Sequence, residues 1–556
     1  PRRALIRRNW ILMRMLNLGY IYKEQYDLSI QAPVSASYHG LVSEVDALYV
    51  SETIRRFMIN EYGLDAYIDG LAVYTTLDST LQNNAVDALK NGLEDYDKRH
   101  GFRTPENFLS LFPEDFFIQN LELRLDLINS SNILPIGISE IPEEEPLESV
   151  YTLLNNLTTT DNQFPVIVIS SDKELIVVSG DRTTHQLAWS TDLGWARPYI
   201  NEDQRGLKPK SYADFIREGD LIWLERDKVT SSLSLTQIPD VQGSLVAMDP
   251  HTGGVKALVG GYDFFLSKFD RATQSSPLLG SNYKPFLYAS ALEAGFTAAT
   301  LINDAPIVFE DKALEDKWRP RNASGRFYGP TRLREGLLQS RNLVSIRLLR
   351  EVGIEKVRKY SENFGFSINS LPSDLSLALG TATLSPLKNA SAYSVFANGG
   401  KSIEPYFISK IVDRFGEIIF EKKENEKKQV IDPRIAFIIK DILQEAANRG
   451  TAKKISELER DDLAGKTGTT NEAESTWFTG FNDSLVACVW VGFDQPKSLG
   501  NREFGSSTAL PIWMDFMRPN LKGLPKNKNL PPDGLISIKV DRKTGLRSDS
   551  NSRNSL

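Results

Sequence analysis

A serine and a lysine three residues apart carry the clearest chemical signal in the sequence. They stand in Gly280-Ser281-Asn282-Tyr283-Lys284-Pro285, directly before an apolar stretch, 286–294, whose spacing predicts a helix that stops at Gly295. Proline is tolerated only near a helix start, so Ser281 is predicted at the mouth of this helix with Lys284 one turn along. A serine hydroxyl becomes a good nucleophile when a base lies within reach, and a desolvated lysine can be that base. Ser281 and Lys284 are therefore candidates for nucleophile and general base.

A serine–lysine pair at this spacing is weak support by itself. Ser170 with Lys173 and Ser385 with Lys388 show the same spacing, and a pair of this kind is usually coincidental. The glycine before Ser281, which lets a ligand approach, and the predicted helix start distinguish the pair at 281–284 from the other two.

Two further motifs follow in the order that this chemistry needs. Ser340-Arg341-Asn342 is predicted in a turn between helical stretches, where the hydroxyl can pass a proton and the carboxamide can bind an amide. Other Ser-x-Asn matches occur, and a lone match is usually a turn cap.

The third motif, Lys466-Thr467-Gly468-Thr469-Thr470, precedes two strand-like runs at 477–481 and 484–492. On a strand, a lysine beside hydroxyls and a small residue can hold a substrate carboxylate and let a peptide lie along the sheet edge. Lys543-Thr544-Gly545 is a rival match, but it lies near a polar tail and is predicted to form a turn. In combination, S-x-x-K, S-x-N and K-T-G form the motif set of serine β-lactamases and penicillin-binding proteins.

The elements that must position these motifs are predicted from the residue pattern. Strands at 243–249 and 254–259 form a hairpin, mostly helical stretches follow to about 400, and strands return at 406–412 and 417–421. A long helix at 435–447 and the pair 477–492 complete the block. Helices between strands from both ends of one block predict an α+β fold, an antiparallel sheet with a helical subdomain. Upstream, 7–19, 20–26, 43–62 and 81–93 are predicted as helices, 70–78 as a strand, and 100–235 as a small β-barrel or sandwich.

Composition excludes several classes of function. The chain has 556 residues, 41% hydrophobic and 25% charged, which is typical of a soluble globular protein of two to four domains. A net charge of −7 argues against nucleic-acid binding. The single cysteine, Cys488, lies in an apolar run and is predicted to be buried, and four scattered histidines give no metal-binding spacing. We expect no cofactor and no metal.

With these motifs, the chain resembles class A penicillin-binding proteins of the 1A type, which are bifunctional peptidoglycan synthases. The resemblance rests on the three motifs and on runs such as 242–253, 269–274, 329–335 and 375–380, and it covers nearly the whole chain. It implies a glycosyltransferase remnant at 1–35, an interdomain linker at 36–100, an OB-like β insertion at 101–235, a transpeptidase domain at 236–540 and a polar tail at 541–556. Because the chain begins at Pro1 and lacks an apolar span, we expect a fragment whose single-pass anchor lies upstream, at the periplasmic face of the inner membrane.

The resemblance also implies a mechanism. Ser281 attacks the carbonyl between two terminal D-alanines of a stem peptide and Lys284 takes its proton. Ser340 and Asn342 relay a proton and hold the peptide, while Lys466, Thr467, Gly468 and Thr469 bind the terminal carboxylate. An amine of a neighbouring stem peptide resolves the acyl-enzyme, and β-lactams acylate the same serine. An outer-membrane lipoprotein activator is the implied partner of the insertion.

Two differences from the family stand out. The catalytic glutamates of the glycosyltransferase are absent, and Pro277-Leu278-Leu279 replaces the usual residues before Gly280-Ser281. Two alternatives stay open: a serine β-lactamase or D,D-carboxypeptidase, or a non-catalytic module that senses β-lactams or acts as a scaffold.

Overall fold

In the computed structural model the chain forms two compact units, Pro1–Asp46 and Ala47–Leu556. The structure describes residues 2–31, 43–107, 146–160, 162–172, 174–227, 229–307, 319–423, 427–541 and 544–548. The first unit contains α1 (Arg2–Asn17) and α2 (Lys23–Gln31), so the two predicted N-terminal helices are present, the second beginning three residues later than predicted. None of the helices in the described ranges combines the length and apolar character needed to cross a membrane.

The centre of the second unit is a five-stranded antiparallel sheet in the order β11-β10-β20-β19-β18. Its strands are β10 (Gln242–Met248), β11 (Val255–Val259), β18 (Ala464–Thr469), β19 (Ser475–Phe481) and β20 (Val486–Gly492). The hairpin predicted at 243–259 and the strand pair predicted at 477–492 are both confirmed. The strand with the Lys466 motif forms one edge of the sheet.

Both faces of this sheet are covered by helices, which explains why β20 is buried along its whole length. On one face, Leu245 and Val489 pack with α4 (Ser79–His100) and α13 (Ala509–Asn520). On the other, Cys488 and Trp490 pack in the larger core, whose helices are α7 (Lys284–Glu293), α8 (Leu333–Leu338), α9 (Asn342–Val352), α10 (Ile354–Ser361), α11 (Pro386–Ala397) and α12 (Pro433–Arg449). The α+β prediction and the burial of Cys488 are confirmed.

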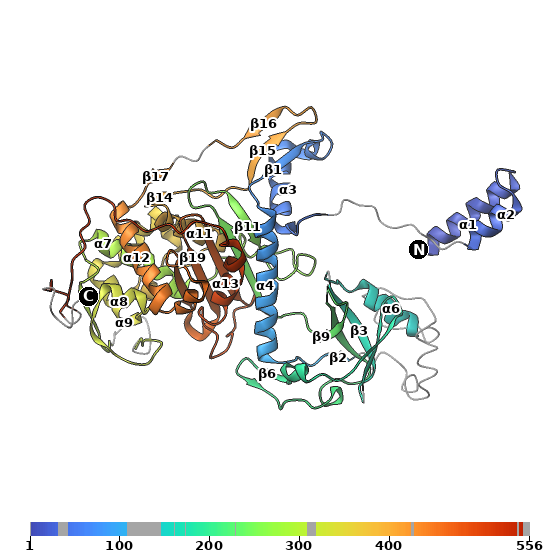
Figure 1. The fold of residues 1–556 in the computed structure, drawn as a ribbon, viewed down its shortest axis with the longest axis horizontal. Coiled ribbons are helices and arrows are strands. Elements are labelled where there is room, and N and C mark those ends of the chain that lie inside the picture. The colour runs from blue at the N-terminus through green and yellow to red at the C-terminus, as the bar shows by residue number, and fades with distance from the viewer. Residues whose placement is uncertain are drawn as a thin grey trace. The chain divides into compact units, whose positions relative to one another are not determined.

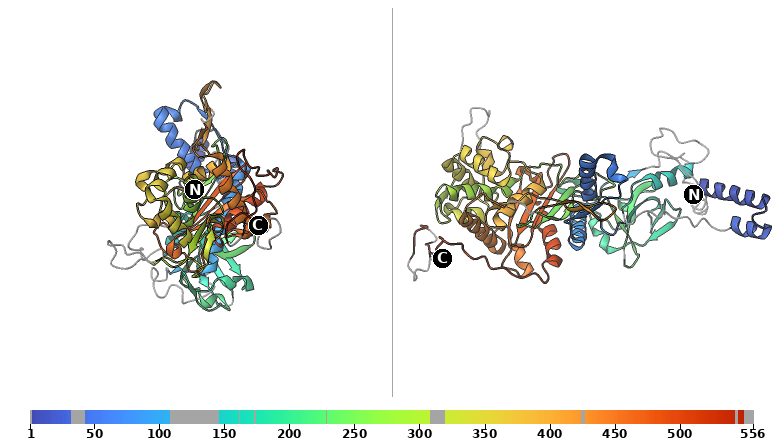
Figure 2. Two further views of the ribbon diagram at one scale, coloured as in Figure 1. Left: turned by 90° about the vertical axis from the view of Figure 1, so that its left-hand side faces the viewer. Right: turned by 90° about the horizontal axis from the view of Figure 1, so that it is seen from above.

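The predicted β-rich insertion is a second sheet, in the order β2-β8-β3-β4-β5 with β9 also paired to β8. Its elements are β2 (Glu106–Asn107), α6 (Pro146–Asn156), β3 (Gln163–Ser170), β4 (Leu175–Ser179), β5 (Thr184–Leu187), β8 (Asp220–Arg226) and β9 (Leu233–Thr236). A short hairpin, β6 (Tyr199–Asn201) and β7 (Gln204–Arg205), projects from it. Helix α4 runs between this insertion and the central sheet (Figures 1 and 2).

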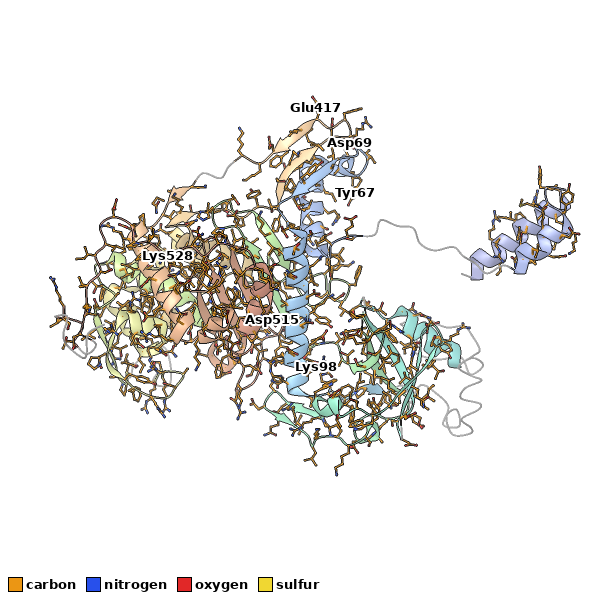
Figure 3. All side chains as sticks on the ribbon, in the orientation of Figure 1. Tyr67, Asp69, Lys98, Glu417, Asp515 and Lys528 are labelled. Carbon is orange, nitrogen blue, oxygen red and sulfur yellow. The ribbon has the colours of Figure 1, made fainter. Side chains whose placement is uncertain are left out.

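One part of the predicted block belongs elsewhere. Strands β15 (Ile408–Val412) and β16 (Ile418–Glu421) do not join the central sheet. In a separate three-stranded sheet, β15 pairs on one side with β1 (Ala72–Thr75), which follows α3 (Leu48–Tyr62), and on the other side with β16. Figure 3 shows Glu417 of this hairpin near Tyr67 and Asp69, with Lys98 near the other end of α4. The strands predicted at 406–412 and 417–421 are therefore present, but their pairing with a segment more than 300 residues away has no local sequence signal.

Two short strand pairs and one turn complete the frame of the site. β12 (Leu301–Asp304) pairs with β13 (Gly329–Arg332) beside α8, and β14 (Lys401–Ser402) pairs with β17 (Lys428–Gln429) beside α11. The turn η5 (Gly280–Tyr283) is a single stretch of 3-10 helix that leads directly into α7.

Candidate active site

Ser281 lies in the turn η5 and not in the α-helix itself. The helix α7 begins at Lys284 with Pro285 in its first turn, where the missing N–H costs nothing. Ser281 is partly exposed, whereas Lys284 is fully buried. The predicted placement of Ser281 at the mouth of a helix is confirmed, and Lys284, predicted one turn along, is the first residue of the α-helix itself.

Three backbone segments meet at the glycine before Ser281. Gly280 has φ +54°, and a Cβ there would lie 2.4 Å from the carbonyl oxygen of Thr469. Gly380 has φ +82°, and its Cβ would lie 1.7 Å from the oxygen of Gly280. The Gly280 amide also donates to the Gly380 oxygen at 2.9 Å. Glycine at both positions therefore lets the turn with Ser281 press directly against strand β18.

The unusual Pro277-Leu278-Leu279 segment is held firmly in this arrangement. The Leu279 amide donates to Ala382 at 3.0 Å, Leu278 forms a β-bridge with Thr383, and the Trp477 indole donates to the Leu278 oxygen at 2.8 Å. These contacts use backbone atoms of 277–279, so the altered side chains are compatible with the close approach of Ser281 to β18.

The two lysines of the motifs converge on one hydroxyl. Lys284 Nζ donates to the Ser340 carbonyl oxygen at 2.8 Å and to Asn342 Oδ1 at 2.8 Å, and lies 3.3 Å from Ser340 Oγ. Lys466 Nζ donates to the same Ser340 Oγ at 3.0 Å and to the Thr467 oxygen at 2.8 Å. Both lysine side chains are completely buried. The structure thus brings together four of the five predicted catalytic residues by direct contact.

Burial and charge set the protonation of this pair. Burial, then the neighbouring charges of Lys466 and Arg341, lower the pKa of Lys284 well below its usual value. Burial alone lowers the pKa of Lys466 to about 7. The positive charge of Lys466 is one cause of the lowered pKa of Lys284, so this arrangement favours a neutral Lys284 beside a charged Lys466. A neutral amine that donates its two hydrogens to Ser340 O and Asn342 Oδ1 keeps a lone pair for an incoming proton.

Ser340 and Asn342 owe their positions to a strained turn between α8 and α9. Ser340 has φ +55°, a value rare for a residue other than glycine. Asn342 begins α9, and its backbone N–H donates to Asn322 Oδ1 at 2.9 Å. Asn322 is held by buried Asp304, whose two oxygens accept from Asn322 Nδ2 at 2.7 and 3.0 Å.

A buried asparagine between the nucleophile and the base ties the motifs together. Asn282 Nδ2 donates to the Lys466 oxygen at 2.8 Å, and Asn282 Oδ1 accepts from Asn389 at 2.9 Å and Thr479 at 3.1 Å. The Tyr393 hydroxyl donates to the Asn282 oxygen at 2.7 Å. Sequence reasoning missed Asn282, Asn322 and Asn389; only the position of Asn282 inside the S-x-x-K motif offered a signal.

The predicted carboxylate-binding residues lie along the edge strand β18. Thr467 Oγ1 donates to Thr451 Oγ1 at 3.0 Å, and Thr469 Oγ1 accepts from the Gly505 amide at 3.0 Å. Gly468 lies between them, beside Asn282. As an edge strand, β18 leaves backbone groups available for an extended peptide.

The rival motifs have structural roles or lie outside the described residues. Ser385 caps helix α11, because its side chain accepts from the Lys388 amide at 3.4 Å. Lys173 and Lys543 are outside the described residues. Within the described ranges, no group of three or more His, Cys, Asp or Glu residues is arranged to hold a metal ion.

Comparison with known proteins identifies the domains that contain these motifs. Residues 243–518 match the penicillin-binding protein transpeptidase domain, and residues 135–241 match the penicillin-binding protein OB-like domain. Penicillin-binding protein 1A of Pseudomonas aeruginosa is 38% identical over 98% of this chain and 68% of its own length. Penicillin-binding protein 1A of Escherichia coli is 33% identical over 99% of this chain and 71% of its own length.

A solved structure gives the same result for the fold. The crystal structure of penicillin-binding protein 1A from Haemophilus influenzae aligns with a TM-score of 0.82 at 31% identity, covering 99% of this chain and 81% of that one. These matches show that the chain belongs to the penicillin-binding protein 1A family, the penicillin-binding transpeptidases of bacterial cell-wall synthesis.

Proposed function

We propose that this chain is a serine D,D-transpeptidase in which Ser281 forms the acyl-enzyme. The convergence of Lys284 and Lys466 on the Ser340 hydroxyl carries the proposal. A buried, neutral Lys284 has a lone pair for the Ser281 proton.

The reaction follows from these positions. Ser281 Oγ attacks the carbonyl carbon between the two terminal D-alanines while its proton passes to Lys284 Nζ. The C–N bond then breaks, and Ser340, between the two amines, relays a proton to the departing D-alanine. An amine of a second stem peptide attacks the ester, restoring Ser281 and forming the cross-link.

Charge and hydrogen bonding orient the donor peptide in this proposal. Protonated Lys466, with the hydroxyls of Thr467 and Thr469, binds the terminal carboxylate, and Asn342 binds a backbone amide. The backbone amides of Ser281 and Thr469 form the oxyanion hole; one such donor lowers a barrier by roughly 3–4 kcal/mol in other enzymes.

The surroundings of the site favour slow release of the acyl group. Among the described residues, the contacts of Lys284 Nζ are a carbonyl, a hydroxyl and an amide oxygen. A β-lactamase needs a base that activates water for deacylation. Within the described ranges, no carboxylate that could serve as this base contacts Lys284 Nζ. We therefore favour transpeptidation over the β-lactamase or carboxypeptidase alternative, and the intact lysines argue against a non-catalytic module.

The test is the intact mass of the protein after incubation with benzylpenicillin, for the unchanged chain and for Ser281→Ala. We expect one stable adduct on the unchanged chain and none on the variant, while Ser290→Ala, a buried serine farther along α7, keeps the adduct. An adduct on Ser281→Ala, or rapid nitrocefin turnover by the unchanged chain, would refute the proposal. Absence of an adduct on every variant would favour the scaffold alternative.

The cellular setting is also proposed from the family. We place the protein at the periplasmic face of the inner membrane, acting on peptidoglycan stem peptides and inhibited by β-lactams. The predicted domain boundaries, the glycosyltransferase remnant at 1–35 and the lipoprotein activator stay predictions.

A further inference from the structure

The segment between β20 and α13 supports the far end of strand β18. We call residues 498–508 the brace. Its Gly505 amide donates to Thr469 Oγ1 at 3.0 Å. A Cβ at Gly505 would lie 2.4 Å from the Gly468 oxygen and 2.5 Å from the Trp477 oxygen, so the brace packs directly on the backbone of β18 and β19.

This contact orients the Thr469 hydroxyl. A hydroxyl has one hydrogen to donate and lone pairs that accept. Because the Gly505 N–H occupies a lone pair of Thr469 Oγ1, the hydroxyl hydrogen points toward another acceptor. In the proposed reaction that acceptor is the carboxylate of the donor peptide.

The brace also holds the turn that joins β18 to β19. The Leu499 amide donates to the Ala473 oxygen at 3.0 Å, and Ser498 Oγ donates to the Glu472 oxygen at 2.7 Å. Glu472 and Ala473 both have positive φ, +60° and +54°. Two consecutive residues in this conformation need support from their surroundings, and the brace supplies it.

Glu503 anchors the brace to the end of helix α4. It is 6% exposed, and its Oε2 accepts from Arg99 Nη2 at 2.9 Å and from the Thr508 hydroxyl. His100 Nε2 lies 3.9 Å from Oε1. Figure 3 marks this end of α4 by Lys98. A buried carboxylate that an arginine and a hydroxyl bind together fixes the loop strongly.

The β insertion provides a second anchor. The Asn501 amide and Nδ2 donate to the two oxygens of Asp203, at 2.7 and 2.8 Å, in the turn between β6 and β7. The Tyr96 hydroxyl of α4 donates to the Leu499 oxygen at 2.8 Å. A cavity of about 760 Å³ lies among these three parts. The brace thus contacts α4, the insertion and the active-site strand.

We propose that Glu503 is a positioning residue for transpeptidation, which holds the brace so that the Gly505 amide orients the Thr469 hydroxyl toward the donor carboxylate. This inference rests on the proposed function of Ser281 and Thr469. Glu503 touches neither substrate nor nucleophile, so its effect must pass through Thr469.

A double-mutant cycle tests this dependence. The second-order acylation rate is measured for Glu503→Ala, Thr469→Val and the double variant, with benzylpenicillin and with its methyl ester, which lacks the carboxylate. We expect Glu503→Ala to slow acylation by benzylpenicillin about tenfold, as loss of one oriented hydrogen bond would. The loss is expected to be much smaller for the ester, and Glu503→Ala is expected to cause no further loss when Thr469 is already valine.

A matched control is Glu52→Ala, a glutamate of α3 paired with Arg55 and Arg56, which is expected to leave both rates unchanged. Equal slowing with acid and ester, additive effects in the cycle, or an unchanged rate for Glu503→Ala would overturn the inference. If Glu503→Ala melts below the assay temperature, Glu503→Gln replaces it in the same cycle. Failure of the unchanged chain to acylate would instead refute the proposed function.

Discussion

Replacing Asn282 by alanine tests whether one buried side chain holds the nucleophile against the Lys466 strand. Asn282 is fully buried and makes three side-chain hydrogen bonds, to the Lys466 oxygen, Asn389 and Thr479. The alanine variant loses all three and leaves the Lys466 carbonyl oxygen without this donor. Asn389 and Thr479 keep a mutual bond at 3.0 Å, which limits the loss on their side.

The magnitude follows from these contacts. At about 1 kcal/mol for each lost hydrogen bond, plus about 1 kcal/mol for a buried carbonyl left unpaired, the free energy of unfolding falls by roughly 3–4 kcal/mol. For a domain of this size the melting temperature falls by roughly 2 °C or more per kcal/mol, giving roughly 6–10 °C in all. The loss also frees the Ser281 turn from β18, so acylation by benzylpenicillin is expected to slow at least tenfold, measured well below the melting temperature.

The matched control is Asn482→Ala. Asn482 is also buried, and its Oδ1 accepts from the backbone amides of Ser484 and Leu485 at 2.9 Å in the turn after β19. This turn lies at the opposite end of β19 from Thr476, the residue that pairs with Thr469. This variant is expected to have a lower melting temperature than the unchanged chain and to be acylated by benzylpenicillin at the same rate. If both variants slow acylation equally, or if Asn282→Ala melts like the unchanged chain, the assigned role of Asn282 is wrong.

Two further outcomes are expected. Lys466→Met removes a charge that lowers the pKa of Lys284, so the pKa of Lys284 rises and the acid limb of the acylation–pH profile moves to higher pH. Thr467→Val is expected to reduce the acylation rate without moving this limb. If the limb does not move in Lys466→Met, the coupling between the two lysines is contradicted. Ser385→Ala removes a helix cap and is expected to cost about 1 kcal/mol of stability with normal acylation, measured by thermal melting and adduct formation; loss of acylation would revive the rival motif.

The local sequence determined the elements and their chemistry. Periodicity predicted the helix after Ser281, a hairpin pattern predicted β10 and β11, and strand-like runs predicted β19 and β20, because these patterns are properties of neighbouring residues. The order of the three motifs predicted the nucleophile, the base and the carboxylate-binding strand. The apolar run around Cys488 predicted that this cysteine is buried, and it is.

Tertiary structure alone decided how these parts meet. The hydrogen bond from Lys466 to Ser340 joins residues 126 positions apart, and the link from Asn282 to Asn389 spans 107. The pairing of β1 with β15 and the contact of Gly505 with Thr469 are equally non-local. Such contacts depend on packing of the complete chain, since no single segment contains both partners. The sequence therefore predicted which groups do the chemistry. The fold determined that two lysines are buried beside one hydroxyl, and this burial lowers the pKa of both amines.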